Sequence, residues 1–147
     1  MEKTNTKTVE DVETVDVYTA KGLLTVGHRY LDVRTSEEFS KSHFEDALNF
    51  PYMFKTDEAS ENDFVGRIVN PDFLPQVASI CKKDDHLIVA CNSGGRASRA
   101  CVELLNEGYQ HVANMGGGYS AWVDAGFAGD KPPGDLKVAC KFRPKDN

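Results

Sequence analysis

The segment His86–Arg96 reads HLIVACNSGGR, and it indicates both the fold class and the place of the chemistry. Its first five residues, His86–Ala90, form a largely apolar run of the kind that is buried on both faces of a parallel sheet. Two adjacent glycines, Gly94 and Gly95, follow shortly after the run ends, and apolar residues at helical spacing continue from Arg96 to Asn106. The sequence therefore predicts a strand, a short loop and a helix in immediate succession.

The same alternation continues on both sides of this segment. Short strands are predicted near residues 14–17, 29–33, 47–50 and 111–115, and helices near 18–24, from Ser36 onward, and near 73–81 and 119–125. The polar stretch Tyr52–Asn70 is predicted to be a long loop. Strands that alternate with helices indicate an α/β fold with a mostly parallel sheet.

The length of 147 residues has room for one domain. We assign the domain to residues 14–128, a flexible N-terminal tail to residues 1–13 and a polar C-terminal tail to residues 129–147. No apolar run approaches the ~20 residues that a membrane-spanning helix needs, so we expect no membrane partner of that kind.

The net charge of −6 argues against nucleic acid or an anionic membrane as a partner, because both reward a basic face. The N-terminus has neither an apolar signal sequence nor a basic transit peptide, which predicts a cytoplasmic protein. The histidines are scattered and the cysteines lie ten or more residues apart, so we expect no disulfide framework, no metal site and no cofactor. The cysteines are Cys81, Cys91, Cys101 and Cys140.

Cys91 follows the predicted strand directly, at the carboxyl end where open α/β sheets place their ligands. Gly94 and Gly95 let the backbone curl so that N–H groups point inward, and the following helix adds partial positive charge, which together favour a thiolate. Asn92 and Ser93 can add polar donors, and Arg96 can hold an oxyanion in a bidentate grip. A buried structural cysteine is the simpler interpretation of Cys91, but its occurrence with the glycines and arginine favours a nucleophile.

Three separated motifs resemble the rhodanese family of sulfurtransferases over about residues 14–126. Tyr30–Arg34, followed by His43, is similar to the first family signature, Cys91–Arg96 to the active-site loop, and Gly117–Trp122 to the terminal signature. The likeness is greatest to plant single-domain sulfurtransferases of the senescence-associated type. Ser42 stands where the family usually has glycine.

The resemblance implies a five-stranded sheet with helices on both faces and a double-displacement cycle. Cys91 would take a sulfane sulfur from thiosulfate or a similar donor, and its persulfide would pass the sulfur to cyanide or a thiol. The resemblance implies glutathione or proteins of the thioredoxin or glutaredoxin type as thiol acceptors. Asp32 and Arg34 are expected to brace the domain and the loop, and Cys101 is expected to be a core residue.

Two other functions remain open at this point. One is a sulfur-sensing or regulatory rhodanese module without catalysis, against which the presence of Cys91 and Arg96 speaks. The other is a phosphatase or arsenate reductase of the same architecture. Those enzymes carry five residues between the cysteine and the arginine, whereas this chain carries four. A tighter loop has less room for a tetrahedral phosphate or arsenate, so the spacing favours sulfur.

Overall fold

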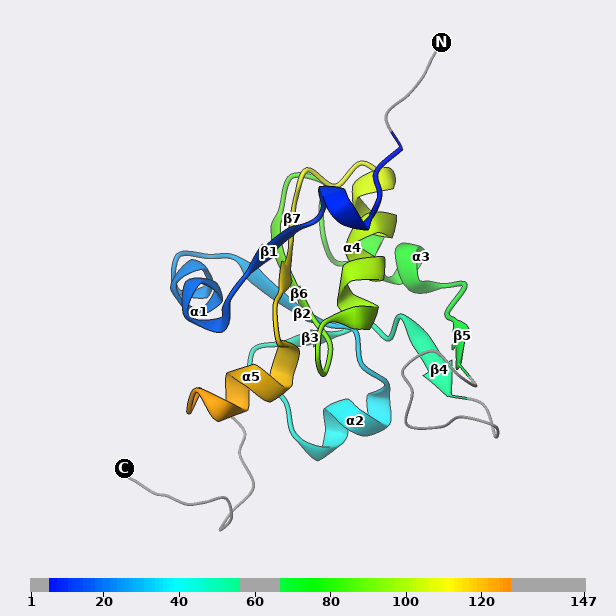
Figure 1. Cartoon of the computed structure of the whole chain (residues 1–147). Coiled ribbons are helices and arrows are strands. Elements are labelled where there is room, and N and C mark those ends of the chain that lie inside the picture. The colour runs from blue at the N-terminus through cyan, green and yellow to red at the C-terminus, as the bar shows by residue number, and fades with distance from the viewer. Residues whose placement is uncertain (1–5, 56–66, 128–147) are drawn as a thin grey trace.

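The computed structural model describes residues 6–55 and 67–127 (Figure 1). Five parallel strands form the main sheet in the order β1-β7-β6-β2-β3, which confirms the predicted fold class. These strands are β1 (Glu13–Val15), β2 (Arg29–Asp32), β3 (Leu48–Asn49), β6 (His86–Ala90) and β7 (His111–Met115). The helices are η1 (Val9–Asp11), α1 (Val17–Thr25), α2 (Ser36–Lys41), α3 (Phe73–Ala78), α4 (Gly95–Asn106) and α5 (Gly118–Asp124).

Alternate residues of the central strands pack into two separate hydrophobic cores, because successive side chains of a strand point to opposite faces of the sheet. Leu31, Val89 and Cys91 belong to the core on the face covered by α3 and α4. Tyr30 and Ile88 belong to the core on the face covered by α1 and α5. The helices accordingly lie on both sides of the sheet (Figure 1).

The described part of the predicted N-terminal tail contacts the rest of the domain. Residues Val9–Asp11 form a 3-10 helix that packs against α4. The backbone of Lys7 exchanges two hydrogen bonds with the side chain of Asn106, at 2.7 and 3.2 Å. A polar, threonine-rich composition did not indicate this docking. The predicted tail from residue 129, which includes Cys140, lies outside the described residues.

The predicted loop Tyr52–Asn70 contains two short strands at its ends. β4 (Met53–Lys55) pairs with β5 (Arg67–Val69) in antiparallel register, so the loop prediction was wrong at these residues. Each strand has only three residues, which is too few for an alternating pattern to be seen in the sequence. Residues 56–66 lie outside the described residues.

Helix α2 begins at Ser36, and Thr35 is its N-cap. The Thr35 hydroxyl accepts a hydrogen bond from the N–H of Glu38. The Glu38 carboxylate accepts one in return from the N–H of Thr35, which completes a capping box. This box fixes Glu38 at the start of α2.

None of the described helices is long and apolar enough to cross a membrane.

Candidate active site

Cys91 is the first residue after β6, at the carboxyl edge of the sheet, and it is fully buried. Its Sγ accepts hydrogen bonds from the backbone N–H groups of Gly94, at 3.0 Å, and Ala97, at 3.3 Å. Ala97 lies in the first turn of α4, so the sulfur sits at the positive end of the helix. This arrangement stabilises negative charge on the sulfur.

Gly94 provides the curvature that brings both donors to the sulfur. Its φ of +119° lies in the left-handed region, which side-chain-bearing residues rarely adopt. Gly95 starts α4, while Asn92 and Ser93 are exposed on the outer side of the loop. The structure thus brings the predicted loop residues together around Cys91. Their roles in binding substrate stay predictions.

The loop is held from behind by the N-terminus of α5. The N–H of Tyr119 donates to the carbonyl of Cys91 at 2.7 Å, and the N–H of Ser120 donates to that of Asn92 at 3.1 Å. Gly118 makes this approach possible, because a Cβ there would lie 2.4 Å from the Cys91 carbonyl oxygen. Sequence reasoning placed this glycine in a family signature without giving it this role.

Arg96 is buried and forms a bidentate ion pair with Glu38. The distances from its Nη1 and Nη2 to the two carboxylate oxygens are 2.8 and 3.2 Å. The predicted grip on a substrate oxyanion is a different use of the same guanidinium, and it stays a prediction. Glu38 was missed as a site residue because its capping box already gave it a local explanation.

Burial of Glu38 and the contacts of its carboxyl group shift the pKa of that group in opposite directions. Burial raises its pKa, but the hydrogen bonds and charge of Arg96, together with hydrogen bonds from Thr35, outweigh burial and bring the pKa to about 2. The carboxylate is therefore ionised at neutral pH, and the two charges hold α2 against the loop-bearing end of α4.

Asp32 and Arg34 form a second buried ion pair at the end of β2, with Arg34 Nη2 2.7 Å from Asp32 Oδ2. The same nitrogen donates to the carbonyl of Ser42 at 2.7 Å, and the guanidinium lies over the ring of Tyr119, 4.4 Å from its centroid. The Tyr119 hydroxyl is hydrogen-bonded to that of Ser42 at 2.6 Å. These contacts link β2, α2 and α5; the predicted bracing of the loop stays a prediction.

Ser42 departs from the family's usual glycine without backbone strain. Its φ of −171° and ψ of 138° are extended, so any residue can occupy this position. Cys101 lies on the buried face of α4, and burial raises the pKa of its thiol well above the usual range. Its place in the core matches the core residue expected there.

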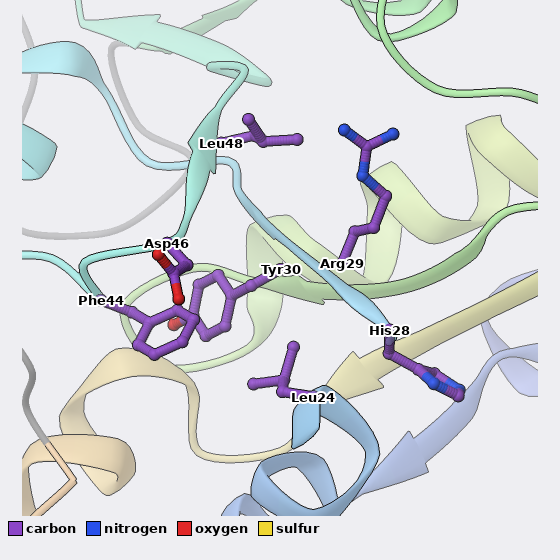
Figure 2. Close-up of a pocket in the computed structure, with 7 residues that line it drawn as sticks. All are labelled: Leu24, His28, Arg29, Tyr30, Phe44, Asp46 and Leu48. Carbon is purple, nitrogen blue, oxygen red and sulfur yellow. The ribbon is translucent and has the colours of Figure 1, made fainter. Parts of the chain in front are cut away.

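A second recess lies away from these residues, near the start of β2. It has a volume of about 210 Å³ and is lined by Leu24, His28, Arg29, Tyr30, Phe44, Asp46 and Leu48 (Figure 2). The rings of Tyr30 and Phe44 lie side by side in it, with centroids 5.1 Å apart, while the guanidinium of Arg29 points away toward Asp85. This recess contains none of the predicted site residues.

Within the described residues, no group of three or more His, Cys, Asp or Glu side chains is placed to hold a metal ion. The chemistry that the described site offers is that of a buried thiol whose sulfur accepts from backbone N–H donors.

Residues 16–125 match the rhodanese-like domain family. The chain belongs to the rhodanese family.

Curated relatives agree with this family. Thiosulfate sulfurtransferase 18 of Arabidopsis thaliana is 48% identical over 80% of this chain and 83% of its own length. Senescence-associated protein DIN1 of Raphanus sativus is 40% identical over 75% of this chain and 56% of its own length. The likeness to plant single-domain rhodanese proteins is thus confirmed.

A further relative is much more similar. Protein HIGH ARSENIC CONTENT 1, mitochondrial, of Arabidopsis thaliana is 80% identical over 100% of this chain and 83% of its own length. Among solved structures, the rhodanese-like domain of the Alr3790 protein from Anabaena sp. superposes with a TM-score of 0.61 at 20% identity, over 91% of this chain and 95% of that domain. This structural likeness supports the rhodanese fold.

The relative named mitochondrial contradicts the prediction of a cytoplasmic protein. That prediction rested on the composition of the N-terminal residues.

Proposed function

We propose that this protein is a sulfurtransferase whose nucleophile is Cys91. The observation that supports this most directly is the pair of N–H groups, from Gly94 and Ala97, that donate to its Sγ. A thiolate in such a ring is stabilised without a general base, and a persulfide at the same position is an anion that the same donors favour.

In the first half-reaction, the Cys91 thiolate attacks the outer sulfur of thiosulfate. A sulfur–sulfur bond forms to Cys91, the sulfur–sulfur bond of thiosulfate breaks, and sulfite leaves with the electron pair. The donor is anionic and the protein carries a net charge of −6, so binding needs local positive charge. The loop N–H groups and the N-terminus of α4 lie at the Cys91 sulfur and supply it.

In the second half-reaction, a nucleophile attacks the outer sulfur of the Cys91 persulfide. Cyanide would become thiocyanate, and a thiolate would become a persulfide, while the Cys91 thiolate leaves and is ready for another turnover. Cys91 is fully buried, so the acceptor must present a narrow reactive end. Small thiols meet this requirement.

The direct test is intact-mass measurement after incubation with thiosulfate. We expect wild-type protein to gain the mass of one sulfur atom, and Cys91→Ser to gain none. Cys81→Ala removes a different buried thiol, and this control should load like the wild type. Loading of Cys91→Ser, or no loading of the wild type, would refute the proposed function.

A second candidate is arsenate reduction, favoured by the full-length 80% identity to a relative named for arsenic content. Arsenate is a tetrahedral oxyanion, so the same donors could receive it. The Cys91 thiolate would displace one oxygen of arsenate as water. An external thiol would then attack the Cys91 sulfur, releasing arsenite and leaving a mixed disulfide, and a second thiol would restore Cys91. The balance is one arsenate and two thiols to one arsenite, one disulfide and one water.

The ratio of two turnover rates separates these candidates. Each rate is measured with the same thiol as second substrate and with thiosulfate or arsenate as the first. The four-residue spacing between Cys91 and Arg96 leads us to expect faster thiosulfate turnover. A higher kcat/KM for arsenate would make arsenate reduction the function and would show that loop spacing does not decide the substrate.

A further inference from the structure

Asn114 lies on the strand next to the one that leads into Cys91. β7 is the sheet neighbour of β6, and Asn114 pairs in register with Val89, two residues before Cys91. Ala113 belongs to the core under α1 and α5, whereas Val112 belongs to the core under α3 and α4. Because successive side chains of a strand alternate between faces, Asn114 points to the face of Val112, which is also the face of Cys91.

The carboxamide of Asn114 faces Gly94 in the loop. A Cβ built on Gly94 would lie 3.9 Å from Asn114 Nδ2 and 4.0 Å from the backbone nitrogen of Gly117. Gly94 is the N-cap of α4, and its N–H donates to the Cys91 sulfur at 3.0 Å. A single residue therefore connects the amide of Asn114 to the sulfur of Cys91.

This carboxamide is buried, and its oxygen is not used by the fold. Asn114 is 6% exposed, and within the part of the chain that the structure describes its Oδ1 accepts no hydrogen bond. Asn70 is the opposite case, because its amide donates to the Pro51 carbonyl at 2.9 Å and its Oδ1 accepts from the N–H of Asp72 at 2.9 Å. A buried amide oxygen without a partner costs free energy that an apolar side chain of the same size does not. This cost indicates that the Asn114 amide has a role other than packing.

We propose that Asn114 is a positioning residue for the nucleophile, on which it acts through Gly94. Its side chain supports the left-handed backbone of Gly94, with φ of +119°, in which the Gly94 N–H points at the Cys91 sulfur. Nδ2 is the positive end of the amide dipole and is the end within 4 Å of the Cβ position at Gly94, so it favours negative charge on the sulfur. The inference rests on the proposed function, because it takes Cys91 to be the nucleophile.

Two substitutions separate this role from packing. Asn114→Leu keeps the approximate size of the side chain and removes the amide. Asn114→Ala removes the amide without adding apolar bulk, so it gives the answer even if the leucine variant does not fold. Val112→Ala is the matched control, because Val112 is also 6% exposed and lies two residues earlier on the same face of β7.

The measurement is an ultraviolet titration of the thiolate. Absorbance is recorded against pH for each protein and for the same protein with Cys91→Ser, and the difference isolates Cys91. The thiolate is the reactive form of cysteine, so the midpoint of this titration reports how strongly the site stabilises that form. The titration contains no sulfur donor, so its result does not depend on sulfur transfer. Loading from thiosulfate is measured separately, by intact mass.

We expect Asn114→Leu and Asn114→Ala to move the titration midpoint to higher pH by about one unit, and to slow sulfur loading at neutral pH by about tenfold. Val112→Ala should lower the denaturation midpoint and leave the titration midpoint unchanged. Asn114 variants whose titration midpoints match that of Val112→Ala would overturn the role of Asn114, while loading of the wild type would still support sulfur transfer. Wild type that never loads would overturn the proposed function itself, and the titration would still decide whether Asn114 acts on the sulfur.

Discussion

At the scale of single residues, the ion pair of Arg96 and Glu38 decides how the loop is held. The pair joins residues 58 positions apart, and only 25% of the Glu38 side chain is exposed. A buried pair broken on one side leaves the other charge without compensation, which is more costly than losing an exposed pair. Glu38 is therefore a positioning residue for Arg96 in the first turn of α4.

This pair makes stability depend on pH in the acidic range. Because the pKa of Glu38 is about 2 in the folded protein and about 4.5 when unfolded, the unfolded chain takes up the proton first as pH falls. The contribution is complete above about pH 4.5 and is lost between there and pH 2. Glu38→Gln should lower the free energy of unfolding at pH 7 by about 3 kcal/mol, and should flatten its decline between pH 5 and pH 3.

Denaturant unfolding at pH 7, 5 and 3 measures this effect. Glu37→Gln is the matched control, because Glu37 is the exposed neighbour on the same helix. Equal effects of the two substitutions would mean that the Arg96 pair contributes nothing particular to stability.

At the scale of elements, Cys91 lies between the N-termini of two helices, α4 and α5. Helix α4 supplies the N–H of Ala97 to the Cys91 sulfur, and α5 supplies the N–H of Tyr119 to the Cys91 carbonyl. Both sides of one residue are thus held by helix starts. The closeness of α5 depends on the absence of a side chain at Gly118.

Gly118→Ala should displace the loop. The added Cβ would lie 2.4 Å from the Cys91 carbonyl oxygen, at a φ of +62°. Gly27→Ala is the matched control, because Gly27 also has positive φ, +109°, but nothing lies within 4 Å of its added Cβ. We expect losses of about 1 kcal/mol for Gly27→Ala and about 3 kcal/mol for Gly118→Ala.

Misplacing a nucleophile by about 1 Å can cost a hundredfold in rate, so Gly118→Ala should also load sulfur from thiosulfate about a hundredfold more slowly. The rate of mass gain and the denaturation midpoint check both effects. If Gly118→Ala behaves like Gly27→Ala in both measurements, the close approach of α5 does not shape the site.

The elements were largely predictable because most of them have local causes. The apolar run His86–Ala90, the glycines after Cys91 and the helical spacing beyond Arg96 all lie within one short segment. The partner of Arg96 was not predictable, because the position of α2 against α4 depends on packing and not on neighbouring residues. The close contact of Gly118 was missed for the same reason.

At the scale of the whole molecule, the two ends of the sheet have different electrostatic character. The carboxyl end carries Cys91 and the two buried ion pairs. At the amino end, His28 directly precedes β2, and His86 and His111 are the first residues of β6 and β7. The ring centroids of His28 and His86 are 4.8 Å apart, and those of His86 and His111 are 4.0 Å apart. These three histidines and Glu13 line one recess, which is separate from the recess in Figure 2.

These three histidines should weaken the fold in mild acid. Burial and the charges of His86 and His111 lower the pKa of His28, while a backbone hydrogen bond with Leu23 and the charge of Glu13 oppose them. The folded protein therefore binds this proton less readily than the unfolded chain, so stability is constant above about pH 6.5 and falls below it. His28→Gln should reduce the difference in unfolding midpoint between pH 7.5 and pH 5.5. An unchanged difference would contradict this origin.

The attachment of the Cys91 loop to α5 has a consequence for protein synthesis. Cys91 leaves the ribosome before Tyr119 and Ser120, whose N–H groups hold the loop carbonyls. The first strand, β1, likewise waits for β7 to become its neighbour in the sheet. A nascent chain therefore carries Cys91 in a loop whose carbonyls still lack their partners from α5. Under the proposed function, we therefore expect an unfinished polypeptide that lacks α5 to react with sulfur donors more slowly than the folded protein.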